Sequence, residues 1–352
     1  MTPKEKVLAC ISGEPEEYVN QFEYVKLCFD PATMFAMGNV VPGGSWLNGW
    51  GVRIIFPEGE PGMFPDTSPE HVVCPDVTKW KETVHMPKTE FTDEEWAPTV
   101  AQVAEVDRSQ YFVAPFVAPG IFEKLHYLMG MEETMINFYE EPEAMHELID
   151  YLTEYEIKVA KEIIDHIHPD ALFHHDDWGS QRSSFLSPDM FDEFITPAYE
   201  KIYGYYKANG VKLIVHHSDS YAANLVPSMI RMGIDIWQGC MYENNIPELL
   251  KKYGRQITYQ GGINNGVVDK PDWTKANVEK ETRRVFKEVQ DAVGLEQSRK
   301  NWIPAAVMGE PGSVFPGVYD YISAVINAMN KGSDVVTEAE KDETKMMTTG
   351  EK

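Results

Sequence analysis

Two short segments concentrate histidine and aspartate directly after apolar runs: FHHDDWGS at 173–180 and IVHHSDS at 214–220. Their ionisable side chains are His174, His175, Asp176, Asp177, His216, His217 and Asp219. Neighbouring side chains of an extended strand alternate between its two faces, so one His and one Asp of the first segment should point inward. Imidazole and carboxylate groups that share a face suit a divalent metal or an acid/base pair.

We predict Asp177, His175, Asp219 and Glu310 as catalytic groups, because each follows an apolar run that is typical of a buried strand. Each of them has a plainer interpretation, as an outward-facing side chain or as a group that orients its neighbour. Nucleophile-elbow, P-loop, CxxC and HExxH motifs are absent from the sequence, so serine hydrolase, kinase and zincin chemistry are unsupported.

A zinc site is predicted at His217 and Asp219, which lie two residues apart and therefore project from the same side of a strand. Cys240, at the end of IDIWQGC, would complete this site as a soft ligand. The alternatives are a histidine that is hydrogen-bonded to its aspartate for structure, and a buried free cysteine that is inert.

Substrate contacts are predicted from aromatic side chains and one amide. Trp46, Trp50, Trp178 and Trp237 could wall an aromatic ring, although tryptophan in a barrel more often serves packing. Gln260 stands at the end of another apolar run, in ITYQGGIN. These five residues complete the predicted site.

The elements that must position these residues alternate regularly from about Tyr111. Apolar runs are separated by amphipathic stretches, which is typical of βαβ units and a parallel sheet. The six runs are YFVAPFVA, ALFHHDDWG, VKLIVHHSD, IDIWQGC, ITYQGGIN and WIPAAVMG, and the earlier VKLCF could supply another strand. No glycine-rich phosphate fingerprint follows any of them, which favours a (β/α)8 TIM barrel over an open doubly wound sheet. In such a barrel the carboxyl ends of the strands form the catalytic face.

Residues 1–332 are predicted to form one barrel domain that includes an irregular N-terminal extension over about residues 1–100. The extension is rich in Trp, Gly and Pro and should hold loops and short strands. Residues 333–352 have few large apolar side chains and are predicted to be a disordered tail.

Composition excludes several classes of function. The net charge is −25, which disfavours nucleic acid and anionic membrane surfaces as partners. No apolar run approaches the roughly 18 residues of a membrane span. The four cysteines are scattered without paired spacing, which indicates a reducing compartment and predicts a cytoplasmic protein. The sequence permits a homodimer without specifying one.

The run DDWGSQRSSFLSPDMFDEFITPAYEKIYGYYKANGVKLIVHHSDS resembles the uroporphyrinogen decarboxylase superfamily, as do the EEPEAMHELIDYL, GIDIWQ and ITYQGGIN segments. The resemblance extends to about residue 330, and the early NGWGVR…PGMFP segment is similar to the methyltransferase-like members. The decarboxylases carry an arginine-rich segment near the amino terminus that holds the carboxylates of the tetrapyrrole. The corresponding FEYVKLCFD contains no arginine.

The other branch of the superfamily comprises corrinoid-dependent methyltransferases. Its coenzyme M-linked members hold zinc with an HxC motif and a later PGC cysteine, which here read His217-Ser218-Asp219 and Pro311-Gly312-Ser313. The resemblance therefore implies a methyltransferase that moves a methyl group from an O-methyl donor, such as a methoxylated aromatic, to the Co(I) of a partner corrinoid protein. It implies zinc in the enzyme and cobalamin in the partner. Uroporphyrinogen decarboxylation, and methyl transfer from a methylcobamide to a thiol or tetrahydrofolate, are the alternatives.

Overall fold

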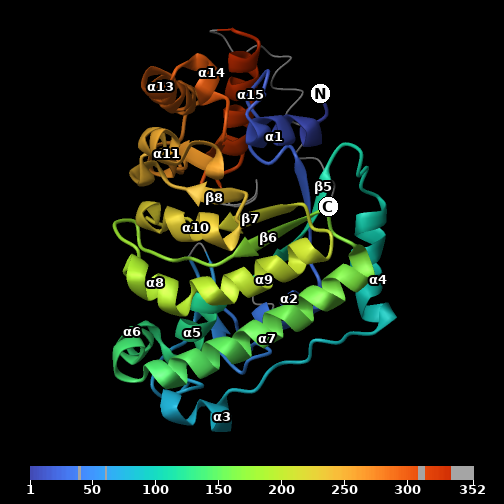
Figure 1. Ribbon diagram of the computed structural model, residues 1–352, viewed down its shortest axis with the longest axis vertical. Helices are drawn as coiled ribbons and strands as arrows, with labels where there is room; N and C mark the ends of the chain where they lie inside the picture. Colours follow the sequence, from blue (N-terminus) through green and yellow to red (C-terminus); the bar gives the residue numbers. More distant parts are fainter. Residues whose placement is uncertain (39–40, 60–61, 308–313, 334–352) are drawn as a thin grey trace.

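The computed structural model describes residues 1–38, 41–59, 62–307 and 314–333. Seven parallel strands form one curled sheet whose spatial order follows the chain, as in a (β/α) barrel (Figure 1). The strands are β1 (Val25–Cys28), β5 (Phe112–Val117), β6 (Ala171–His175), β7 (Leu213–His217), β8 (Ile236–Cys240), β9 (Thr258–Ile263) and β10 (Trp302–Ala306). The predicted α/β barrel class is confirmed, with seven strands rather than eight among the described residues.

Side chains from the segment before β1 connect it to the other end of the sheet. Gln21 accepts a hydrogen bond from the amide of Ala306, and the side chain of Gln260 donates to the carbonyl of Gln21. The hydroxyl of Tyr24 donates to Oε1 of Gln260 at 2.7 Å. Gln260 thus joins β9 to the chain entering β1, so this predicted substrate contact lies inside the barrel and serves its closure.

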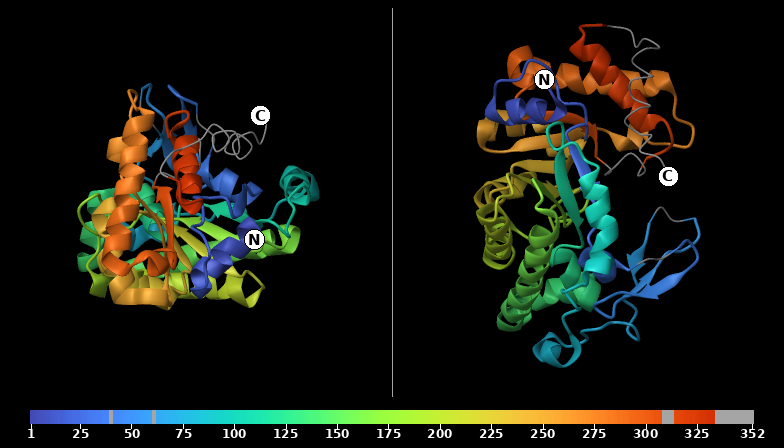
Figure 2. Two further views of the ribbon diagram at one scale, coloured as in Figure 1. Left: turned by 90° about the horizontal axis from the view of Figure 1, so that it is seen from above. Right: turned by 90° about the vertical axis from the view of Figure 1, so that its right-hand side faces the viewer.

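Helices cover the outer face of the sheet (Figures 1 and 2). The longer ones are α1 (Pro3–Ser12), α4 (Asp93–Ala104), α5 (Ile121–Met129), α6 (Met131–Glu140), α7 (Pro142–Ile167), α9 (Thr196–Ala208), α11 (Ile246–Tyr253), α13 (Lys275–Val293) and α15 (Val318–Asn330). The shorter ones are α2 (Pro31–Met37), α3 (Trp80–Thr83), α8 (Pro188–Phe194), α10 (Val226–Met232), α12 (Asn265–Val268) and α14 (Leu295–Ser298). None of the described helices is both long enough and apolar enough to cross a membrane.

The strands from β5 to β10 are largely buried on both faces, and their side chains alternate between two cores except beyond the irregularity between Gln238 and Cys240. Phe173 and Val215 belong to the core inside the barrel. Leu172 and Ile214, one position earlier on the same strands, belong to the core between the sheet and the helices. Whether a residue occupies an odd or an even position of its strand, which we call its parity, therefore decides whether its side chain points toward the barrel axis or toward the helices.

The N-terminal extension adds a second, antiparallel sheet of three short strands. These are β2 (Ser45–Leu47), β3 (Arg53–Ile55) and β4 (Phe64–Pro65). Figure 2 shows this sheet standing out from the barrel beside α2 and α5. Of the tail predicted over 333–352, only Ser333 is within the described residues.

Candidate functional site

His175 and His217 end two neighbouring strands, β6 and β7, and are paired in register. Both share the parity of the inner core, so they lie on the inner side of the sheet. Their rings stack with centroids 4.5 Å apart and planes at 18°. Nδ1 of His175 contacts Oε2 of Glu123 at 2.9 Å, and Nδ1 of His217 contacts Oε1 of Gln238. None of the described residues hydrogen-bonds Nε2 of either ring.

Asp177 joins the two histidines in a group with the spacing of metal ligands. One ligand atom from each of His175, Asp177 and His217 lies within 4.8 Å of the others. Oδ1 of Asp177 accepts the backbone amide of Asp219 at 2.9 Å, which fixes the carboxylate. The structure therefore brings three predicted site residues together and places the fourth, Asp219, beside them.

The charges in this group are strongly coupled. Burial alone would lower the pKa of His175, but the carboxylates of Glu123, Asp177 and Asp219 raise it to about 10. Burial lowers the pKa of His217 to about 4, helped by the neighbouring charge of His175. Burial, and then Asp177, raises the pKa of Asp219 to about 7. Near neutral pH the group thus contains one protonated and one neutral imidazole, and Asp219 holds part of a proton.

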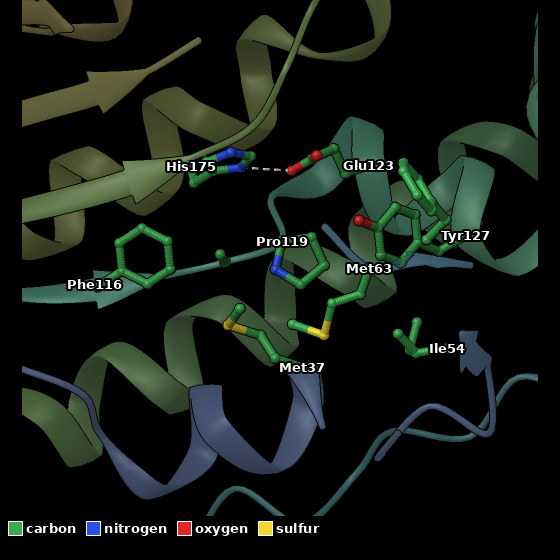
Figure 3. Close-up of a pocket in the computed structure, with 10 residues that line it drawn as sticks. Met37, Ile54, Met63, Phe116, Pro119, Glu123, Tyr127 and His175 are labelled. Carbon is green, nitrogen blue, oxygen red and sulfur yellow. Dashed lines mark hydrogen bonds and ion pairs between the residues drawn. The ribbon is translucent and has the colours of Figure 1, made fainter. Parts of the chain in front are cut away.

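A cavity of about 110 Å³ opens against His175 and Glu123 (Figure 3). Its walls are mostly apolar and come from the extension and from the β5–α5 connection. The lining residues are Met37, Ile54, Met63, Phe64, Phe116, Ala118, Pro119, Glu123, Tyr127 and His175. The volume is well below the roughly 300–1,000 Å³ of sites for drug-sized ligands, so the cavity suits a small molecule.

The other polar residues of the two segments have the opposite parity and support the site from outside. Asp176 accepts the amides of Phe122 and Glu123, the indole of Trp178 and the hydroxyl of Tyr199. It therefore anchors the first turn of α5 and so the backbone of Glu123. The hydroxyl of Tyr203 lies 3.1 Å from Nδ1 of His174 and 2.7 Å from Nδ1 of His216, so both rings belong to the packing under α9.

The remaining predicted site residues that the structure describes lie apart from the cavity. Cys240 is fully buried between the sheet and the helices, beyond an irregularity in the β8–β9 register, and is not in the metal-spaced group. The four tryptophans do not line the cavity. Trp50 packs edge-on against Tyr155, Trp178 stacks on His216, Trp237 donates to the carbonyl of Ser218, and Trp46 is 49 % exposed on β2. Glu310 lies outside the described residues.

The model of the family described as uroporphyrinogen decarboxylase (URO-D) matches residues 51–296, more than half of the chain. The chain belongs to the uroporphyrinogen decarboxylase family. Among solved structures, a methyltransferase from Methanosarcina mazei is similar in fold, with a TM-score of 0.60 and 13 % identity over 94 % of this chain and 99 % of that one. No curated protein matches the sequence significantly.

A second structure, named as a fructose-1,6-biphosphate aldolase from Coccidioides immitis, has a TM-score of 0.29 and 9 % identity. The match covers 68 % of this chain and 87 % of that one. This score is too low to bear on the fold, so the fold assignment depends on the family match and on the methyltransferase.

The most important residue that the sequence analysis missed in this member of the uroporphyrinogen decarboxylase family is Glu123. It lies in the first turn of α5, just after β5, and the strand run YFVAPFVA that precedes it was recognised. Applying the strand-end rule to this run would have pointed to the segment that contains Glu123. No signal in the sequence pointed to the lining residues of the extension, because their positions depend on how that irregular segment folds onto the barrel.

Proposed function

We propose that this protein is a corrinoid-dependent methyltransferase, which moves a methyl group from an O-methyl donor to the Co(I) of a separate corrinoid protein. One observation carries the proposal: a small, mostly apolar cavity adjoins a cluster of His and Asp at the carboxyl ends of β6 and β7. The cavity suits the apolar body of a methyl donor, and the cluster suits stabilisation of the oxygen that leaves.

The composition of the cavity favours methyl transfer over decarboxylation of a tetrapyrrole. A polycarboxylate needs guanidinium or ammonium partners, and none of the lining residues is Arg or Lys. The likeness to a methyltransferase fold is consistent with this choice. Decarboxylation remains the second candidate because the matching family bears that name.

The site fits zinc. His175, Asp177 and His217 would be three protein ligands with one position left open, the arrangement of catalytic zinc sites. Both imidazoles use Nδ1 for Glu123 or Gln238 and leave Nε2 free of described partners, as metal-ligating histidines do. Bound zinc would supply Lewis-acid stabilisation of the leaving oxygen. This set replaces Asp219 and Cys240 of the sequence-based hypothesis with His175 and Asp177.

The protein's own residues have three tasks in the reaction. The methyl carbon breaks its bond to oxygen and forms one to Co(I), so the apolar cavity must hold the donor with its methyl group accessible to the partner. Glu123 and Gln238 fix the two imidazole rings. The backbone amide of Asp219 donates to Oδ1 of Asp177 and holds that carboxylate in position beside the two imidazoles.

Incubation of the protein with a chemically reduced corrinoid protein and a panel of methyl ethers tests this proposal. We expect the absorbance of methyl-Co(III) to appear with at least one ether, and to be lost in His217→Ala. Cys240→Ala is the matched control, because its side chain lies in the outer core, and it should retain the reaction. Release of carbon dioxide from uroporphyrinogen, without methyl transfer from any donor, would establish the decarboxylase instead.

A further inference from the structure

We propose that the cavity selects methyl donors without a negative charge, so that the substrate is an uncharged methyl ether and not a methoxybenzoate. The inference rests on the proposed function and makes it more specific. It starts from the lining itself, where seven of the ten residues are apolar and the single acidic one, Glu123, is bound to His175. A carboxylate placed there would find no ammonium or guanidinium partner among the lining residues, and the lining cation, the His175 imidazolium, is already paired with Glu123.

The Lys and Arg residues that directly neighbour lining residues in the sequence already pair with carboxylates. Lys124 follows the lining residue Glu123, but its ammonium is buried and pairs with Glu156 and with the carbonyl of Pro119. Arg53 precedes the lining residue Ile54, and its guanidinium lies 3.6 Å from Asp66. The undescribed internal segments 39–40, 60–61 and 308–313 read NV, EP and MGEPGS, which contain no Lys or Arg, whereas the undescribed residues 334–352 include Lys341, Lys345 and Lys352.

Tyr127 reports the electrostatic environment of the cavity. Its phenol is one of the lining groups, on α5 one turn after Glu123 (Figure 3). Burial, and then the carboxylates of Glu123, Asp177 and Asp176, raise the pKa of Tyr127 above its ordinary value. An anionic substrate in the same cavity would meet the same loss of water and the same three carboxylates. An uncharged phenol or ether would meet the apolar walls, the Tyr127 hydroxyl and the Glu123–His175 pair, without adding a further negative charge.

Two single-ring donors test whether the cavity discriminates against negative charge. At pH 7, 2-methoxyphenol is uncharged and 4-hydroxy-3-methoxybenzoate is an anion. Calorimetry with each donor on the intact protein measures binding, and methyl-Co(III) formation measures turnover. Burying an unpaired carboxylate costs several kcal/mol, so we expect the uncharged donor to bind about 100-fold more tightly or better. Equal or tighter binding of the benzoate would overturn the inference while leaving methyl transfer intact.

A charge introduced into the wall should reverse the preference. Met63 lines the cavity and is partly exposed, so Met63→Lys places an ammonium beside the donor without burying it fully. We expect the benzoate to gain at least about 10-fold in affinity, as for a charge-assisted contact. Met34→Lys adds the same charge at an exposed methionine that does not line the cavity, and should change neither affinity.

Met37→Lys provides a second position in the wall if Met63→Lys does not fold. The two readouts also separate this inference from the proposed function. Tight binding of 2-methoxyphenol without any methyl transfer would sustain the charge selectivity and reject the methyltransferase. Failure of both donors to bind, or tight binding of a trimethylammonium compound in preference to either, would reject the selectivity for uncharged donors.

Discussion

Replacing Glu123 by Gln should remove the proton that His175 carries at neutral pH. His217 provides the reference within the same site, because its ring stacks on that of His175 and its Nδ1 faces the amide oxygen of Gln238 instead of a carboxylate. Burial and the charge of His175 lower the pKa of His217 to about 4, whereas the carboxylates around His175 raise its pKa to about 10. Glu123→Gln gives His175 the same kind of partner as His217.

We expect the pKa of His175 to fall from about 10 to below its ordinary 6.5 in this variant. A change of at least about 3 pH units corresponds to roughly 4 kcal/mol of interaction. The sign of the effect on stability follows from the direction in which the pKa of His175 is shifted. Because the folded pKa of His175 is raised, its ion pair stabilises the fold fully below pH 6.5 and progressively less as pH rises toward 10. The difference in unfolding free energy between wild type and variant should therefore shrink over this window.

Two measurements on protein kept metal-free with EDTA check this prediction. Carbon-detected NMR titration of the ten histidines, assigned with His175→Gln, gives the pKa directly. Urea unfolding between pH 6 and pH 10 gives the stability difference. Glu132→Gln, an exposed change on α6, is the control and should alter neither. A wild-type His175 that titrates near 6.5, or a value that Glu123→Gln leaves unchanged, would refute the reasoning.

Three further predictions follow from other parts of the structure. Metal analysis should find that Asp177→Ala loses zinc while Cys240→Ala keeps it, since only Asp177 belongs to the metal-spaced group. Burial raises the pKa of Asp30 to about 6, so the contribution of this group to stability should fall as pH rises from 4 to 7. In urea titrations the stability of Asp30→Asn relative to the wild type should therefore rise by about 3 kcal/mol over that range. Trp237→Phe should cost about 2 kcal/mol in unfolding by leaving the Ser218 carbonyl unpaired, without changing donor affinity in calorimetry.

The barrel could be predicted from the sequence because its evidence is local and repeated: each apolar run became a strand, and both His/Asp segments became strand ends. The parity of those strands could not be predicted. Parallel strands are buried on both faces, so Leu172 and Phe173 look alike in the sequence although they belong to different cores. Strand alternation then decides that His175 and His217 face inward and that Trp237 packs outside, whereas Cys240 packs outside because of the irregularity in the β8–β9 register.

Tertiary contacts account for the rest of the site. Glu123 reaches His175 because Asp176 holds the first turn of α5, a contact between residues more than fifty positions apart. Met37 and Met63 reach the cavity because the extension folds back over β5 and α5. Neither arrangement leaves a spacing pattern in the sequence, which is why aromatic side chains were predicted as the substrate wall and methionines were not.

Transfer of a labelled methyl group tests the central claim most directly. The intact protein, loaded with zinc, is mixed with reduced corrinoid protein and a CD3-labelled uncharged methyl ether, and the corrinoid is analysed by mass spectrometry. Our account predicts a CD3-corrinoid and one equivalent of the demethylated product, both lost in His217→Ala and retained in Cys240→Ala. An unlabelled corrinoid with an intact ether, from protein whose zinc content and binding of the donor are verified, would contradict it.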